Sequence, residues 1–329
     1  MEFSELTRLA SGHVEARIIQ AAVQLRIFDC IGSQSVDAPA VASALGLDPK
    51  ATELLLNALT AVDLLHKRDN RYSIAAVSAK HLLRTSPEYL GGMILFDASL
   101  WNCWGKLAEA VRSGMPVRTP DMYQEDPSET EIFINAMDSL VNARGDADIV
   151  ANTIDWSGVT ELLDVGSGPA SFPIALCKRF PKLQATIFDL PGTVAIAERY
   201  VRKARMAERI RLVAGDFRTD PIPGNYDVVF LSNIIHGEGE QENASLVHKL
   251  VANLKAGGRI VVKDHILEDS RTTPTVGAVF SLLMLLTTES GRCYSFTEVK
   301  GWMERAGLSH VQQIDLPPPL TSSLVIGAQ

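Results

Sequence analysis

Three aspartates and one histidine accompany successive predicted strands, at positions from which their side chains could act on one ligand. Asp164 lies in the first strand, and Asp189 and Asp216 follow the second and the third. We place His236 at the end of the fourth. Because the carboxyl ends of parallel strands meet at one edge of a sheet, we expect these side chains to gather there. Carboxylates suit a cationic ligand, and a histidine suits proton transfer near neutral pH.

The segment LLDVGSGPAS at residues 162–171 predicts a strand, a glycine turn and then a helix. Gly166 and Gly168 would let the backbone approach a nucleotide-like ligand closely. A dinucleotide site would have a further glycine at Ser171, and Asp164 would repel a pyrophosphate. The same carboxylate would attract the ammonium and the sulfonium of S-adenosylmethionine (SAM), which has no phosphate. We therefore predict SAM as the cofactor and disfavour an NAD-dependent oxidoreductase.

The second and third strands support the same cofactor. Asp189, followed by Leu190, could accept both ribose hydroxyls. Asp216 could accept a hydrogen bond from the adenine amino group, and Phe217 offers an aromatic face for the ring. Any one of these acids could be only a turn or helix-cap residue, but three at one edge of a sheet favour a binding site.

From about residue 160 the chain alternates strand, turn and helix. The predicted strands cover residues 161–165, 184–188, 210–214, 226–231 and 259–263, and the predicted helices cover residues 171–180, 193–207 and 241–254. Their apolar runs suit a parallel sheet covered on both faces. Strands at residues 310–316 and 323–328 are too close for a parallel crossover, so the last strand should run antiparallel.

The first part of the chain, to about residue 150, has helical periodicity. Asp37 and Asp48 each precede a first turn that contains proline, which predicts helix N-caps. The expected elements are a helix from Asp37 to Gly46, a helix over residues 49–65, a hairpin of residues 64–67 and 71–74, and longer helices over residues 88–113 and 129–151. The helices and the hairpin form a winged-helix arrangement.

Charge and composition exclude several classes of partner. The net charge of −8 and the pI near 5.4 argue against nucleic acid and anionic membranes. The helix over residues 49–65 has Lys50 against Glu53 and Asp63, so we expect it to pack against a second copy rather than DNA. The four cysteines are far apart, and neither a signal peptide nor a membrane-spanning run is visible. We expect a cytoplasmic protein without a metal site.

The motifs LLDVGSG, IFDLP, GDF, YDVVFLSNIIH and LKAGGRIVVKD, with FINAM at residues 133–137, resemble the class I methyltransferases. More narrowly, nearly the whole chain resembles small-molecule O-methyltransferases with an N-terminal winged-helix dimerisation domain, such as the caffeic-acid type and its bacterial relatives. The resemblance implies an α/β fold with a Rossmann-like seven-stranded sheet and a homodimer. It implies cofactor contacts at Gly166, Asp189, Asp216, Phe217 and Ser232, and we expect further contacts at Asp164, Gly168 and Leu190.

The same resemblance implies the domain organisation. We expect a winged-helix dimerisation domain at residues 1–110, linker helices that contribute to the substrate pocket at residues 111–150, and the SAM-binding domain at residues 151–329.

The family's catalytic histidine aligns with His236, as the base that deprotonates the acceptor hydroxyl. The usual His-Asp-Trp pattern is replaced by Gly237, Glu238 and Gly239 after His236. Of the two acids that hold the histidine in the family, the first aligns with Asp264 and the second with Cys293. The imidazole could therefore be held more loosely, or by Glu238.

Apolar residues that could line the substrate pocket are Phe133, Met137, Trp104 and Met284, although each could equally be a core residue. The sequence thus predicts methyl transfer to a hydroxyl of a small aromatic or enolic molecule. C-methylation of an electron-rich ring and a cofactor-binding homologue without turnover are the alternatives.

Overall fold

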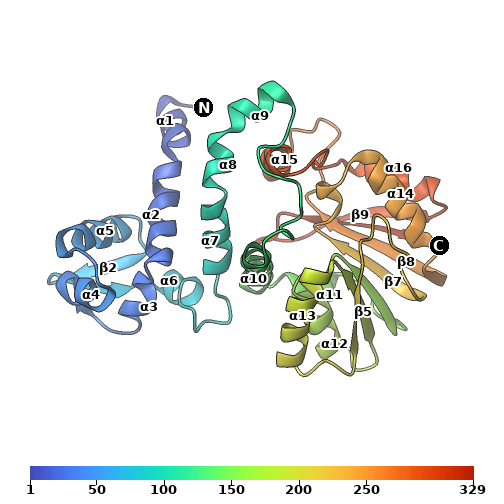
Figure 1. Cartoon of the computed structure of the whole chain (residues 1–329), viewed down its shortest axis with the longest axis horizontal. Coiled ribbons are helices and arrows are strands. Elements are labelled where there is room, and N and C mark those ends of the chain that lie inside the picture. The colour runs from blue at the N-terminus through green and yellow to red at the C-terminus, as the bar shows by residue number, and fades with distance from the viewer. The chain divides into compact units, whose positions relative to one another are not determined.

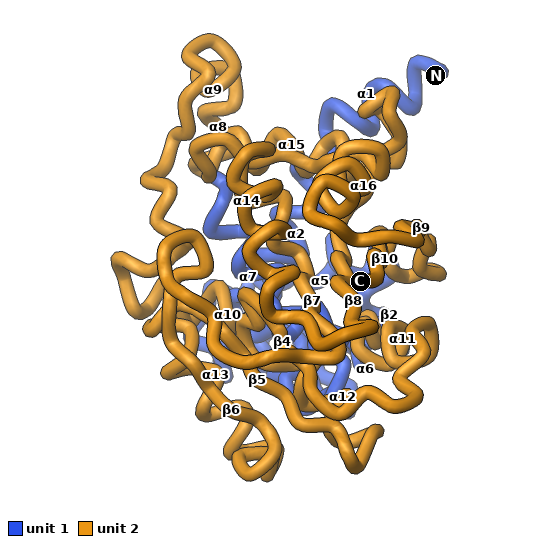
Figure 2. The backbone as a smooth tube through the Cα atoms, turned by 90° about the vertical axis from the view of Figure 1, so that its right-hand side faces the viewer, with its two compact units in different colours: residues 1–101, 135–143 blue, residues 102–134, 144–329 orange.

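The computed structural model describes all 329 residues, which form two compact units (Figures 1 and 2). The first unit comprises Met1–Trp101 and Asn135–Ala143, and the second comprises Asn102–Ile134 and Arg144–Gln329.

The first unit is mostly helical and contains a small sheet. Its elements are α1 (Phe3–Ser11), α2 (His13–Gln24), α3 (Ile27–Ile31), β1 (Val36–Asp37), α4 (Ala38–Leu45), α5 (Pro49–Ala61), β2 (Leu65–Arg68), β3 (Arg71–Ile74), α6 (Ala76–His81) and α7 (Gly91–Ser99). The carboxylates of Asp37 and Asp48 accept hydrogen bonds from Ala40 N and Ala51 N, so both predicted N-caps are confirmed. The predicted hairpin is present as β2 and β3, and β1 pairs with β3.

Helix α5 buries Leu56 and Leu59 in the core of this unit, together with Ile27, Phe28 and Tyr72. It ends at Ala61, four residues before the end that its periodicity predicted. The reason is the turn at Asp63, whose φ of 60° no helix can continue.

Two long helices predicted from the sequence are interrupted. Residues 88–113 form α7, α8 (Trp101–Gly105) and α9 (Leu107–Ser113). Residues 129–151 form α10 (Pro127–Arg144) and α11 (Asp146–Thr153). Gly145 separates the latter pair with a φ of 69°, a left-handed conformation that ends a helix.

The second unit contains the seven-stranded sheet, whose order is β6-β5-β4-β7-β8-β10-β9. Its strands are β4 (Glu161–Val165), β5 (Gln184–Asp189), β6 (Ile210–Ala214), β7 (Tyr226–Ser232), β8 (Leu254–Asp264), β9 (Ser309–Asp315) and β10 (Ser323–Ala328). Strand β10 is antiparallel to β8 and β9, whereas β4 to β8 pair in parallel. The predicted fold class, with its antiparallel last strand, is confirmed.

Helices cover the sheet on both sides, as Figure 1 shows. They are α12 (Ser171–Arg179), α13 (Pro191–Lys203), α14 (Glu240–Val251) and α16 (Phe296–Arg305). Helix α15 (Thr275–Thr287) lies apart from the strands and contacts α9. Neither α15 nor α16 was predicted. Helix α16 starts with a capping box, in which Ser295 and Glu298 bond each other's backbone N–H groups.

A buried group of charges joins the start of α11 to the end of β8. Asp146 accepts a two-pronged hydrogen bond from Arg144, at 2.9 and 2.8 Å. Nζ of Lys263 lies 3.0 Å from Oδ2 of the same carboxylate. The side chains of Asp146 and Lys263 are both inaccessible to solvent. Such a pair persists only while both charges are present, because a lone buried charge is very costly.

We predict that Asp146→Asn lowers the free energy of unfolding by about 3–5 kcal/mol, because it leaves the ammonium of Lys263 without its carboxylate. Urea denaturation measures this loss. The half-exposed pair of Lys255 and Asp227 provides the control, and Lys255→Met should cost less than about 1 kcal/mol. Equal losses in the two variants would contradict the role given to the buried pair.

Candidate active site

The glycine turn lies between two carboxylates, one buried and one half-buried. Asp164, at the end of β4, is 1% exposed and accepts a hydrogen bond from Ser167 Oγ at 2.7 Å. Its other oxygen, Oδ1, is buried and has no partner in the chain. Asp189, at the end of β5, accepts from Gly168 N at 2.8 Å and from Leu190 N at 2.7 Å. The carboxylate of Asp189 thus fixes the turn from the neighbouring strand.

Burial changes the acidity of both groups. It raises the pKa of Asp164 to about 7, although the hydrogen bond from Ser167 opposes this change. It also raises the pKa of Asp189 to about 6, against the hydrogen bonds of Gly168, Leu190 and Thr193. Neither carboxylate forms an ion pair with a lysine, arginine or histidine. The turn therefore carries one buried and one half-buried acidic group that no cation of the chain neutralises.

Gly166 has a left-handed backbone conformation that favours glycine. Its φ is 65°, and a Cβ at this position would lie 2.2 Å from Cδ1 of Ile234. The sequence did not point to Ile234, because its contact with the turn arises only when β7 lies beside β4. Ser232, at the end of β7, has a buried hydroxyl without a partner.

Asp216 differs from expectation. Its carboxylate is bound by the guanidinium of Arg218, with Nη2 at 2.8 Å from Oδ2, and by the backbone N–H of the same arginine. The hydrogen bond of Arg218 lowers the pKa of Asp216. From the sequence, this carboxylate was expected to bind the adenine amino group, but in the structure it binds the neighbouring Arg218. Phe217, which lies between Asp216 and Arg218 in the sequence, packs against the hydrophobic core.

His236 lies beyond the strand rather than in it. Strand β7 ends at Ser232, and His236 is in a 3-10 turn, η1 (Ile235–Gly237). Nδ1 of His236 is 2.8 Å from Oδ1 of Asp264, the last residue of β8. The two strands are paired with Ser232 opposite Lys263, which brings the turn and Asp264 together.

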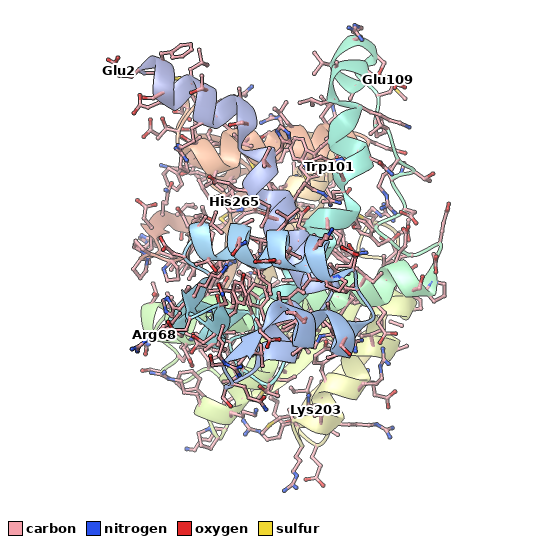
Figure 3. The ribbon with its side chains drawn as sticks, turned by 90° about the vertical axis from the view of Figure 1, so that its left-hand side faces the viewer. Glu2, Arg68, Trp101, Glu109, Lys203 and His265 are labelled. Atoms are coloured by element: carbon pink, nitrogen blue, oxygen red, sulfur yellow. The ribbon has the colours of Figure 1, made fainter.

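Asp264 is an acceptor in this pair. Burial alone would raise its pKa, but the imidazole of His236 and its hydrogen bond lower the pKa below the usual value. A carboxylate can only accept, so Nδ1 of His236 carries the hydrogen and Nε2 is left with a free lone pair. His265, labelled in Figure 3, donates its backbone N–H to the same carboxylate at 2.7 Å. The ring of Phe280 packs edge-on against His236, with centroids 4.8 Å apart.

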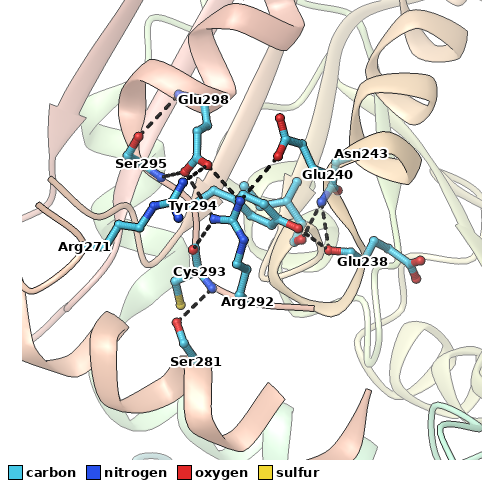
Figure 4. Close-up of polar contacts among 11 residues, drawn as sticks. Glu238, Glu240, Asn243, Arg271, Ser281, Arg292, Cys293, Tyr294, Ser295 and Glu298 are labelled. Carbon is cyan, nitrogen blue, oxygen red and sulfur yellow. Dashed lines mark hydrogen bonds and ion pairs between the residues drawn. The ribbon is translucent and has the colours of Figure 1, made fainter. Parts of the chain in front are cut away.

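Neither Cys293 nor the side chain of Glu238 binds the imidazole. Burial raises the pKa of Cys293 to about 12, so the thiol is neutral. Its backbone N–H donates to Ser281 Oγ at 3.1 Å (Figure 4). Glu238 enters the hydrogen bonds of this region through its backbone carbonyl. The side chain that forms a hydrogen bond with the ring of His236 is therefore Asp264.

The candidate substrate residues are dispersed over three helices. Phe133 on α10 stacks on Tyr123, with centroids 4.6 Å apart. Met284 is buried on α15, and Trp104 is half-buried on α8. Met137 is half-buried on α10, in the first unit.

Two other features bear on ligands and surroundings. No group of three or more histidine, cysteine or acidic residues is arranged to hold a metal ion. None of the helices combines the length and the apolar character needed to cross a membrane.

The sequence matches known proteins over almost its whole length. A family model described as O-methyltransferase domain matches residues 104–309, and one described as O-methyltransferase dimerisation domain matches residues 7–84. The 3-hydroxy-5-methyl-1-naphthoate 3-O-methyltransferase of Streptomyces sahachiroi is 33% identical, over 98% of this chain and 94% of that protein. The tetracenomycin polyketide synthesis 8-O-methyl transferase TcmO of Streptomyces glaucescens is 28% identical, over 97% and 95%.

The relatives include an enzyme that methylates carbon. The L-tyrosine C(3)-methyltransferase of Streptomyces lavendulae is 27% identical, over 96% of this chain and 90% of that protein. Among solved structures, PigF with SAH (S-adenosylhomocysteine) has a TM-score of 0.90 and 26% identity, with both chains covered completely. The chain therefore belongs to the family of SAM-dependent O-methyltransferases with an N-terminal dimerisation domain.

Proposed function

We propose that the enzyme transfers a methyl group to a hydroxyl of a small aromatic or enolic molecule, with His236 as general base. The observation that carries this proposal is the 2.8 Å hydrogen bond between Nδ1 of His236 and the buried carboxylate of Asp264. It leaves Nε2 as the proton acceptor and stabilises the ring once it becomes an imidazolium. A pair so arranged favours turnover over a role in cofactor binding alone.

SAM, when bound, supplies a methyl group on a sulfonium, which is already an activated leaving group. The chain must therefore bring the acceptor oxygen into line and remove its proton. Nε2 of His236 takes the hydroxyl proton as the oxygen attacks, and Asp264 holds the ring in place through Nδ1. Phe280, which is half-buried and packs edge-on against the ring, offers no carboxylate that would compete with Asp264.

The glycine turn fits a cationic cofactor. Asp164 is buried and Asp189 is half-buried, neither has a cation from the chain, and Oδ1 of Asp164 is without a partner. A ligand with an ammonium and a sulfonium would supply the missing positive charge. We assign the cofactor to these two acids and to Gly166, Gly168, Leu190, Asp216, Phe217 and Ser232.

The relatives favour an aromatic hydroxyl as acceptor. One is named for 3-O-methylation of a hydroxynaphthoate and another for 8-O-methylation in polyketide synthesis. The C-methyltransferase relative supports a second candidate, methylation of a carbon of an electron-rich ring. In that reaction His236 would take a proton from the ring carbon or from an activating hydroxyl. Phe133, Met137, Trp104 and Met284 remain our candidates for the acceptor pocket.

We propose a homodimer formed through the dimerisation domain, whose family model covers residues 7–84. The exposed apolar residues of α1, which include Phe3, Leu6 and Leu9, suit burial against another chain. We retain residues 1–110 as the dimerisation domain, 111–150 as the linker and 151–329 as the cofactor-binding domain.

His236→Ala should lower kcat by about 10²–10⁴-fold, the usual contribution of a general base. Asp264→Asn should also lower kcat, because a neutral amide does not stabilise the imidazolium as a carboxylate does. Steady-state kinetics on a panel of phenols measures both, and calorimetry should show unchanged SAH affinity. The exposed His248 on α14 serves as a control, and His248→Ala should leave kcat unchanged. Undiminished turnover in His236→Ala would remove the assigned base.

The position of the transferred methyl separates the two candidate reactions. We expect NMR of the product to show a methyl ether when a phenol is incubated with enzyme and ¹³C-methyl SAM. A methyl signal on a ring carbon would refute O-methylation and support the second candidate.

SAM binding should tighten as pH rises, because the acids of the glycine turn must ionise to attract a cation. With the pKa of Asp164 near 7, the dissociation constant should fall about tenfold between roughly pH 6 and pH 8. Titration calorimetry in buffers of equal ionic strength measures this change. Asp164→Asn should weaken binding and flatten the pH dependence. Affinity that is constant or falls with pH in the wild type would contradict the electrostatic role of this carboxylate.

A further inference from the structure

The turn that carries His236 is held by hydrogen bonds to its backbone carbonyls. Nδ2 of Asn243 donates to Ile235 O at 2.8 Å and to Glu238 O at 3.1 Å. The hydroxyl of Tyr294 also donates to Glu238 O, at 2.7 Å (Figure 4). The residues on both sides of His236 are thus fixed by two side chains that do not touch its ring.

These two side chains come from different elements and are completely buried. Asn243 lies in the first turns of α14 and is 0% exposed, and Tyr294 precedes α16 and is 1% exposed. A buried donor must keep its acceptor, because losing it leaves a polar group unsatisfied in the interior. The turn is therefore anchored to two parts of the fold rather than to its own strand alone.

Tyr294 is itself fixed in orientation. Its ring packs edge-on against Trp302, with centroids 4.8 Å apart, and the guanidinium of Arg292 lies 4.2 Å from its centroid. Arg292 is paired with Glu298 at 2.8 Å. Burial raises the pKa of Tyr294 to about 12, against the charge of Arg292, so its hydroxyl remains a donor.

The segment before Tyr294 also packs directly on the turn. A Cβ at Gly291 would lie 2.3 Å from His236 O, so no larger residue fits there. Cys293 lies in this segment, at the position where the resemblance expects a second acid. The segment contacts the turn through its backbone and through Tyr294 instead of through a carboxylate on the imidazole.

We propose that Asn243 and Tyr294 are positioning residues for His236: they hold its turn so that Nδ1 meets Asp264 and Nε2 meets the acceptor. This inference rests on the proposed role of His236 as base. It predicts that loss of either donor lowers the rate of the chemical step and leaves the affinity for the cofactor unchanged.

The chain offers a matched control at the opposite end of β7. Nδ2 of Asn253 donates to Ile222 O at 2.8 Å and to Gly224 O at 2.9 Å, and Tyr226 donates to Pro223 O at 2.6 Å. Both side chains are buried, at 8% and 3% exposure. An asparagine and a tyrosine thus hold a second turn with the same chemistry, away from His236.

The experiment compares Tyr294→Phe and Asn243→Ala with Tyr226→Phe and Asn253→Ala. All four should lower the melting temperature, since each removes a buried donor. Only the first two should lower kcat, by about 3–10-fold for Tyr294→Phe, as expected for one lost hydrogen bond. The KM for the phenol and the SAH affinity should stay within about twofold of wild type. If Asn243→Ala fails to fold, Tyr294→Phe still tests the positioning role, because this substitution removes only one oxygen atom.

A spectroscopic signature separates this inference from the proposed function. In protein labelled with ¹⁵N-histidine, the Nδ1–H signal of His236, identified by its loss in His236→Ala, should shift or broaden in Tyr294→Phe and stay unchanged in Tyr226→Phe. An unchanged signal and full kcat in Tyr294→Phe and Asn243→Ala would overturn the positioning role. Full kcat in His236→Ala would instead overturn the proposed base, while the signal would still report on the position of the ring.

Discussion

The hydrogen bond between His236 and Asp264 depends on the parallel pairing of β7 with β8. Ser232 lies opposite Lys263, so the turn after one strand and the last residue of the other emerge at the same edge of the sheet. A slip of one residue would point Asp264 to the other face, because side chains alternate along a strand. The register of these two strands is therefore the constraint on which the proposed catalytic pair depends. The register alone does not determine the conformation of the turn that carries His236. Hydrogen bonds from Asn243 and Tyr294 hold that conformation.

Carboxylates at two places on this sheet differ in whether the chain supplies a cation to pair with them. Asp146 is matched by Arg144 and by Lys263, so the interior near the end of β8 is neutralised by the chain. Asp164 is buried as well and Asp189 is half-buried, yet no cation of the chain reaches them. Leaving carboxylates unmatched is costly unless they become protonated or meet a cation. This contrast agrees with membership of a family that uses a cationic cofactor.

Sequence patterns predicted the regular part of the fold well. The strands β4, β6 and β10 have the predicted bounds, because short apolar runs between turns are a strong local signal. Strand β8 begins at Leu254, five residues before its predicted start, since the glycines at 257 and 258 hide the strand pattern. Helix α15 was missed because it is apolar on all sides and shows no helical stripe. The capping box of Ser295 and Glu298, by contrast, is a local sequence signal for the start of α16.

The candidate site was only partly predictable, because some of its contacts join residues that are far apart in the sequence. Asp164 and Asp189 lie in the last positions of β4 and β5, and the glycines follow β4, at positions that local sequence reveals, but the assignment of Asp264 came from the resemblance to a family. Tyr294 reaches Glu238 across 56 residues of sequence, and no local pattern encodes such a contact. The pairing of Asp216 with Arg218 could have been noticed, because the two residues are close in the chain.

The most direct test of this account is a crystal structure of the enzyme with SAH and a phenolic acceptor. The account predicts the acceptor oxygen at hydrogen-bond distance, about 3 Å, from Nε2 of His236, with Asp264 still bound to Nδ1. An acceptor oxygen bound by another side chain, with the imidazole turned away from it, would contradict the central claim.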